Sequence, residues 1–165
     1  AADGALEVKT DRLATACWRP EQPQQLQILS DASGWWRSGD RAALETDLSI
    51  LGRLDGAVIS GGETVFPEQL EARLLASALP LEAVLLLGVP DADWGECLVG
   101  LVRSSASDIV ERLQDVTKSW PAAERPQRWL LCPELAPSEA GKWQRSRWQA
   151  WLQSQESGHP PEPDG

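Results

Sequence analysis

The chain has 165 residues, a mass of 18.0 kDa and a formal charge of -10 at neutral pH. No apolar run approaches the ~20 residues that span a bilayer, and an acidic chain repels phosphate backbones and anionic lipids. The three cysteines form no CxxC pair, and the one histidine, His159, lies in a Pro-rich terminal segment. We therefore expect a soluble cytoplasmic protein without a metal site, a disulfide or histidine-based catalysis, and with neither nucleic acid nor membrane as a partner.

Residues 1–54 are expected to form a β-rich segment. Short apolar runs, such as Leu26–Leu29 and Leu48–Leu51, alternate with clusters of Gly, Pro and Gln that are typical of turns. The segment holds too few apolar residues to build a complete core of its own. We therefore expect it to be the last part of a larger domain, with a boundary near Asp55.

Residues 55–152 are predicted to form a small α+β domain with helices over 67–77, 107–119 and 143–152. The first begins with a proline and carries acids in its first turn, which suits the helix dipole. Ser107 is the expected N-cap of the second. The third places apolar residues along one face.

Three apolar segments between these helices are predicted strands: 83–89, 97–102 and 129–131. The first two are continuous apolar runs, which is typical of strands buried on both faces. The sequence therefore predicts a small three-stranded sheet with flanking helices. Residues 153–165 hold no core residue and are rich in proline, so we expect a disordered tail.

Single residues suggest chemistry only weakly. Lys142, Arg145 and Arg147 lie between 140 and 152 without any acid, which suits either an anionic ligand or a solvated helix end. Gly61 and Gly62 are by themselves a hairpin signal. The cysteines are most simply explained as small buried apolar residues.

Two further acids, Asp40 and Asp55, also have simple structural explanations. Asp40 suits chelation of a ribose through its two carboxylate oxygens, but an aspartate after a glycine is also common in turns. Arg53 and Asp55 are spaced to form a surface ion pair, which contributes little stability.

In combination, however, five segments resemble the C-terminal third of the adenylate-forming acyl-CoA synthetase family. These segments are Trp36–Asp40, Gly52–Glu63, Pro67–Glu71, Gly88–Glu96 and Pro137–Lys142. Their order and their spacing agree with the family over about residues 34–150. The resemblance implies an acid-thiol ligase in which a carboxylate attacks ATP to give an acyl-adenylate, and the thiol of CoA then displaces AMP.

The resemblance also implies roles for individual residues. Asp40 matches the aspartate that binds the ribose hydroxyls of AMP, and Arg53 matches an arginine that contacts the nucleotide. Lys142 matches the lysine that enters the site for adenylation, where its charge offsets the charge that develops at the α-phosphate. ATP, Mg²⁺ and CoA are the implied cofactors and co-substrates, with Mg²⁺ held mainly by parts of the enzyme that precede this chain.

Three other positions match moving parts of the family. Asp55 matches the hinge between the large domain and a small mobile lid. Gly61 and Gly62 match the loop that faces the site in the second step, where absent side chains let the pantetheine arm of CoA pass. The expected organisation is thus the end of the large domain over 1–54 and the lid over 55–152.

The chain also departs from the family. Ser38 replaces the usual threonine, and Gly56 replaces a second acid at the hinge. The family's phosphate loop and acyl pocket would precede residue 1, so we expect a fragment that is inactive alone and packs against the rest of the large domain.

The sequence leaves the substrate open. The form Ser60-Gly61-Gly62-Glu63 and the short lid are most like the ortho-succinylbenzoate:CoA ligases of menaquinone and phylloquinone synthesis. The alternatives are a ligase for another acid, a ligase that uses a carrier-protein thiol, and a stand-alone lid that binds a nucleotide or a partner chain without catalysis.

Overall fold

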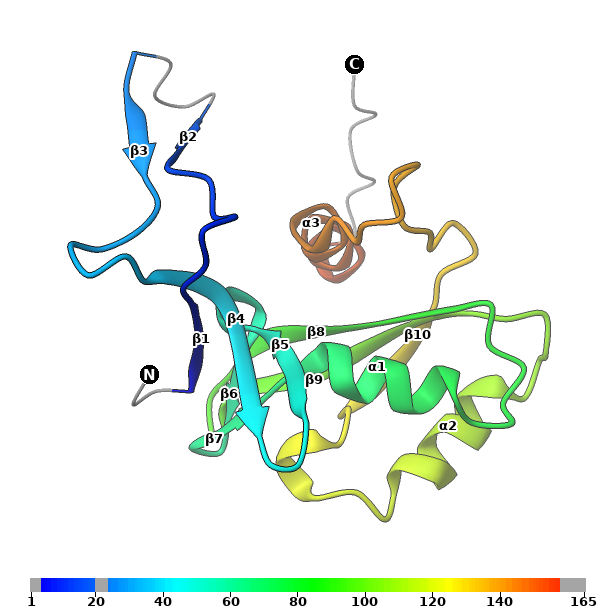
Figure 1. Cartoon of the computed structure of the whole chain (residues 1–165). Helices are drawn as coiled ribbons and strands as arrows, with labels where there is room; N and C mark the ends of the chain where they lie inside the picture. Colours follow the sequence, from blue (N-terminus) through cyan, green and yellow to red (C-terminus); the bar gives the residue numbers. More distant parts are fainter. Residues whose placement is uncertain (1–3, 20–23, 158–165) are drawn as a thin grey trace. The chain divides into compact units, whose positions relative to one another are not determined.

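The structure is a computed structural model that describes residues 4–19 and 24–157 (Figure 1). The chain divides into two compact units, Ala1–Ala57 and Val58–Gly165, here named the N-terminal unit and the C-terminal unit. Each is described by itself. In the part of the chain that the structure describes, no helix is long and apolar enough to cross a membrane.

The N-terminal unit is built from short strands. β1 (Ala5–Val8), β4 (Trp36–Leu44) and β5 (Leu48–Arg53) form an antiparallel sheet in the order β1-β4-β5. β2 (Ala16–Trp18) and β3 (Leu26–Ile28) form a separate two-stranded ribbon. A short 3-10 turn, η1 (Leu54–Gly56), ends the unit. Ala5 is buried, but large apolar side chains on β2, β3, β4 and β5 are exposed, as expected of a segment with a thin core.

The C-terminal unit is centred on a five-stranded sheet. Its strands are β6 (Val58–Ser60), β7 (Glu63–Val65), β8 (Ala83–Asp91), β9 (Gly95–Arg103) and β10 (Arg128–Leu131). β9 is central, antiparallel to β8 over its whole length and parallel to β10. The prediction of three strands is therefore wrong. β6 and β7 have three residues each, which is too short for apolar alternation to reveal them.

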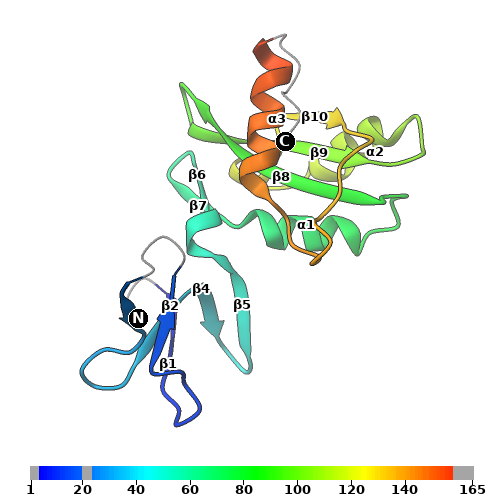
Figure 2. The same ribbon diagram turned by 90° about the horizontal axis from the view of Figure 1, so that it is seen from above.

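Helices cover both faces of this sheet (Figures 1 and 2). α1 (Pro67–Leu75) and α2 (Ile109–Thr117) pack on one face, where Leu86 and Val102 join their apolar side chains in one core cluster. α3 (Arg145–Ser157) crosses the strands on the other face, where Trp148 and Leu152 pack against the alternate residues of β8 and β9. The prediction that the strands now labelled β8 and β9 are buried on both faces is confirmed.

The predicted start of α2 is off by one residue. Asp108, not Ser107, occupies the N-cap position of α2, and its side chain makes no capping hydrogen bond. Near the end of α2, Val116 is 40% exposed, while Thr117 is buried and its hydroxyl donates to the carbonyl of Leu113.

α3 continues five residues beyond its predicted end. Residues 153–157, predicted to be disordered, are helical, because Gln, Ser and Glu tolerate the helix and no proline occurs between positions 145 and 159. The remainder of the predicted tail, 158–165, lies outside the described residues.

Candidate functional site

The β4–β5 hairpin brings together two of the predicted nucleotide-binding residues. Asp40 on β4 lies directly opposite Arg53 on β5, and directly opposed residues of antiparallel strands project to the same face. Nη1 of Arg53 is 4.0 Å from Oδ1 of Asp40. A Cβ on Gly39 would lie 2.8 Å from Nη2 of Arg53, so glycine leaves the room that the guanidinium occupies. The backbone N–H of Asp40 donates to Oγ of Ser38 at 3.0 Å.

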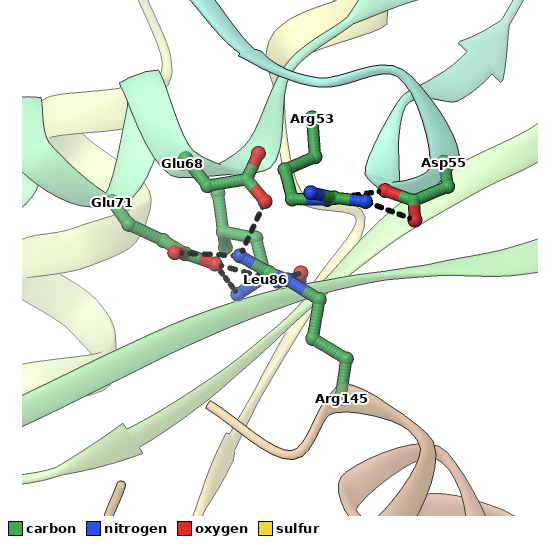
Figure 3. A network of polar contacts seen from close by, with 6 residues as sticks. All are labelled: Arg53, Asp55, Glu68, Glu71, Leu86 and Arg145. Carbon is green, nitrogen blue, oxygen red and sulfur yellow. Dashed lines mark hydrogen bonds and ion pairs between the residues drawn. The ribbon is translucent and has the colours of Figure 1, made fainter. Parts of the chain in front are cut away.

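Arg53 also binds Asp55 through two hydrogen bonds (Figure 3). Nε donates to Oδ1 at 2.8 Å and Nη2 donates to Oδ2 at 2.7 Å. These hydrogen bonds hold the pKa of Asp55 below its ordinary value. The side chain of Arg53 is 57% exposed and that of Asp55 is 69% exposed. The sequence correctly predicted this surface pair, and its exposure leaves the guanidinium accessible to a ligand.

Gly61 and Gly62 form the two-residue turn of the β6–β7 hairpin. Their φ angles are 58° and 83°, a backbone conformation that glycine adopts at little cost. The N–H of Gly61 donates to the carbonyl of Trp94 at 2.9 Å, and a Cβ on Gly61 would lie 2.6 Å from the indole ring. A Cβ on Gly62 would meet no described atom within 4 Å. One side of the turn is thus packed against Trp94, and the other side is open.

Lys142 follows a tight loop that precedes α3. The N–H of Gly141 donates to the carbonyl of Ser138 at 2.8 Å, and the N–H of Ser138 donates to the carbonyl of Lys142 at 2.9 Å. Oγ of Ser138 accepts from the N–H of Lys142 at 3.3 Å. Gly141 has a φ of 73°, which favours glycine there. The loop fixes the backbone of Lys142 and leaves its side chain exposed.

Arg145 belongs to a buried polar network that the sequence did not predict (Figure 3). Its guanidinium donates to both carboxylate oxygens of Glu71 and to the carbonyl of Leu86. Burial raises the pKa of Glu71, although the hydrogen bonds from Arg145 oppose this shift. Arg145 therefore fits neither alternative that the sequence left open, an anionic ligand or a solvated helix end, because its guanidinium binds groups of its own chain. Its partner is 74 residues away in the sequence, so no local pattern indicates it.

The structure brings Asp40, Arg53 and Asp55 together in the N-terminal unit. Gly61, Gly62 and Lys142 belong to the C-terminal unit, on two different loops. Within residues 4–19 and 24–157, no group of three or more His, Cys, Asp or Glu side chains is arranged to hold a metal ion.

Comparison with known proteins identifies the relatives of this chain, although no family model matches it. A 2-succinylbenzoate–CoA ligase of Enterococcus faecalis is 27% identical over 147 residues, which cover 87% of this chain and 29% of that enzyme. The 4-chlorobenzoate–CoA ligase of a Pseudomonas species is 36% identical over 100 residues, or 58% of this chain and 19% of that enzyme. The homologues of this chain are acyl-CoA ligases.

A solved structure supports the same relationship. Escherichia coli MenE with a bound analogue of OSB-AMS is 28% identical, with a TM-score of 0.67 over 92% of this chain and 32% of that protein. The chain therefore spans about a fifth to a third of the length of these acyl-CoA ligases. The mixed α/β fold, with three α-helices among the described residues, is consistent with part of such an enzyme.

The C-terminal unit of this acyl-CoA ligase homologue also contains an open pocket of about 520 Å³. It is lined by residues of β8, β9 and α3, among them Asp91, Cys97 and Gln149. Burial, followed by the nearby charge of Asp91, raises the pKa of the Cys97 thiol. The raised pKa favours the protonated thiol, which is a poorer nucleophile than the thiolate.

Proposed function

We propose that this chain is the C-terminal portion of an AMP-forming carboxylic acid:CoA ligase. The main observation in support is the likeness to MenE, at 28% identity over 92% of the chain. The proposed enzyme first joins a carboxylate to the AMP moiety of ATP and then transfers the acyl group to the thiol of CoA. Because this chain spans about a third or less of its relatives, the remaining contacts to ATP, Mg²⁺ and the acid belong to other parts of the enzyme.

The proposed nucleotide contacts are Asp40 and Arg53. The carboxylate of Asp40 suits two ribose hydroxyls, because each of its oxygens accepts a hydrogen bond. Arg53 suits a phosphate, because its planar fork binds anionic oxygens in pairs. Their position on one face of a hairpin, with an exposed side chain at Arg53 and a partly exposed one at Asp40, supports a role in ligand binding rather than in folding.

Lys142 is the proposed catalytic residue of the first step. A lysine ammonium near the α-phosphate stabilises the negative charge that develops as the carboxylate attacks. The fixed backbone of the Ser138–Lys142 loop and the exposed side chain support this role, because they present a mobile charge from a defined position.

We further propose that the C-terminal unit is a mobile lid that turns about Asp55. The division into two units falls shortly after Asp55, which supports a hinge there. In the second step, the turn at Gly61 and Gly62 would face the pantetheine arm of CoA, and the open side of Gly62 supports this assignment. One lid then serves two reactions in turn, because different faces are presented to the same site.

The proposed partners follow from the same assignment. The exposed apolar side chains of the N-terminal unit, Leu26, Ile28 and Leu44 among them, suit a surface that the rest of a large domain covers. We also propose a cytoplasmic location, which is compatible with the use of ATP and CoA as co-substrates.

For the acid substrate, we propose 2-succinylbenzoate. The Enterococcus faecalis and Escherichia coli relatives support this choice. A second candidate is another aryl acid, favoured by the 36% identity to a 4-chlorobenzoate–CoA ligase. A panel of acids, each assayed with CoA and with a carrier-protein thiol as acceptor, separates these candidates by the ratio of their kcat/KM values.

The proposed function is tested with Lys142→Ala in the ligase that contains this chain. We expect the rate of adenylate formation, measured as the release of pyrophosphate, to fall by about 100-fold or more. CoA transfer from a supplied acyl-adenylate should stay nearly intact. Lys118→Ala, at an exposed position beyond α2, is the matched control and should leave both steps unchanged. An equal loss in both steps would contradict the assignment of Lys142.

A further inference from the structure

Arg145 connects three elements of the C-terminal unit through one guanidinium (Figure 3). Nη1 donates to Oε1 of Glu71 at 3.0 Å and to the carbonyl of Leu86 at 2.8 Å. Nη2 donates to Oε2 of Glu71 at 2.9 Å and lies 3.2 Å from Oε1 of Glu68. Arg145 is the first residue of α3, the two glutamates lie on α1, and Leu86 lies on β8. The start of α3 is therefore tied to a helix and a strand that are distant in sequence.

Glu71 completes the connection to β8. Its Oε1 accepts the N–H of Leu86 at 2.7 Å, while the carbonyl of Leu86 accepts from Arg145. Both backbone groups of one strand residue are thus satisfied by the two side chains of an ion pair. Glu71 is 5% exposed, and a buried carboxylate of this kind is costly unless it stays paired. The geometry of the pair is therefore tightly determined.

The backbone on both sides of Lys142 is held in place. Before it, Leu135 is fully buried. After it, Trp143 packs against the same core cluster as α3. Between them, the hydrogen bonds of the Ser138–Lys142 loop are internal to the loop, so they set its shape but not its position. Arg145, three residues after Lys142, is the polar contact that joins the end of this loop to α1 and β8.

We propose that Arg145 is a positioning residue for Lys142, and that Glu71 is its anchor. The guanidinium fixes where the loop ends, so that the lysine reaches the reacting phosphate in one defined geometry. This inference rests on the proposed role of Lys142. A displacement of about 1 Å in such a group can reduce a rate by about 100-fold, so the effect is measurable.

The first experiment measures hydrogen–deuterium exchange of this chain. With Arg145→Lys, which keeps the charge but loses the planar fork, we expect peptides from 137–144 to exchange about tenfold faster. Arg145→Ala should increase exchange further if that variant remains folded. Arg147→Ala is the matched control, because Arg147 lies on the same helix and places its guanidinium 5.4 Å from the Trp148 ring without joining this network. Unchanged exchange in 137–144 with Arg145→Lys would overturn the proposal.

The second experiment measures the two half-reactions in the ligase that contains this chain. We expect Arg145→Lys and Glu71→Gln to slow adenylate formation by about 100-fold while CoA transfer from a supplied acyl-adenylate changes little. A general loss of folding would lower both rates together, and that result would overturn a specific positioning role. A full rate of adenylation with Arg145→Lys would equally overturn it.

The two proposals fail in different ways. If Lys142→Ala loses both half-reactions equally, the catalytic assignment of Lys142 fails, while the exchange experiment still decides whether Arg145 fixes the loop. If Lys142→Ala affects adenylation alone and the Arg145 and Glu71 variants do not, only the positioning role fails.

Discussion

Two arginine–carboxylate pairs, one in each unit, use the same chemistry in different surroundings. Arg53 and Asp55 share two hydrogen bonds at the surface, with side chains 57% and 69% exposed. Arg145 and Glu71 also share two hydrogen bonds, but their side chains are 22% and 7% exposed. An exposed pair is screened by water and exchanges partners readily, whereas a buried pair cannot be broken without leaving a charge in the interior. The surroundings, and not the residue types, therefore separate an exposed pair, which we propose contacts a ligand, from a buried structural one.

The pKa directions of the two acids show the same contrast. The pKa of Asp55 is lowered, because the hydrogen bonds from Arg53 favour its charged form. The pKa of Glu71 is raised, because burial disfavours the charged form more than Arg145 favours it. Each acid therefore reports which physical effect is larger at its position.

The largest effect is expected from removal of the buried guanidinium. Arg145→Ala leaves Glu71 buried without its charged partner, so we expect the free energy of unfolding of the C-terminal unit to fall by about 3–5 kcal/mol. Urea denaturation measures this change. Arg112→Ala is the control, because Arg112 pairs with Asp108 at an exposed position on the same unit and should cost about 0.5 kcal/mol. A loss below about 1 kcal/mol for Arg145→Ala would contradict the contrast between buried and exposed pairs.

Two adjacent glycines allow a second comparison, because they share a turn but differ in their surroundings. Both Gly61 and Gly62 have positive φ, so alanine at either position is strained by about 1–2 kcal/mol. Gly61→Ala should cost more than Gly62→Ala, because its Cβ alone would overlap the Trp94 ring. The difference between the two free energies of unfolding isolates this contact, and equal costs would show that the indole moves aside freely.

Arg53→Ala should have only a small effect on folding. The pair with Asp55 is exposed, so we expect a loss of about 0.2–1 kcal/mol in the free energy of unfolding. In the proposed ligase, the same variant should raise the KM for ATP, because the proposed contact of Arg53 with a phosphate is removed. A stability loss above about 2 kcal/mol would place Arg53 with Arg145 as a structural residue.

The smallest effects are expected in the pH dependence of stability, with opposite signs at the two acids. Because the pKa of Asp55 is lowered from 3.8, its stabilising contribution is present above that value and is lost as the pH falls through the folded-state pKa. Because the pKa of Glu71 is raised from 4.5, the folded state holds its proton more firmly, and its contribution falls as the pH rises from 4.5 through the raised value.

Asp55→Asn and Glu71→Gln remove these two dependences separately. Urea denaturation at a series of pH values, with each variant compared with the unmodified chain, should give difference curves that slope in opposite directions. Curves of the same sign would mean that burial does not dominate at Glu71.

Much of this arrangement could be predicted from local sequence, and the rest depends on distant pairing. Gly61-Gly62 indicates a tight hairpin because few other residues adopt positive φ, and the apolar run of 83–89 indicates a strand covered on both faces. The register that sets Asp40 opposite Arg53 could not be predicted, because β4 has no clear apolar alternation and the pairing shifts between Arg41 and Ala42. The partnership of Arg145 with Glu71 joins segments 74 residues apart, and the charge of neither indicates the other.

The ion pair at Leu86 also affects how the sheet meets other molecules. β8 pairs with β9 along one side, and in the described sheet its other side is an edge. An open strand edge is a template on which another chain can add a strand and begin to aggregate. At the middle of β8, Glu71 and Arg145 already occupy the N–H and the carbonyl that an incoming strand would need. The two side chains therefore disfavour the addition of another strand at this edge.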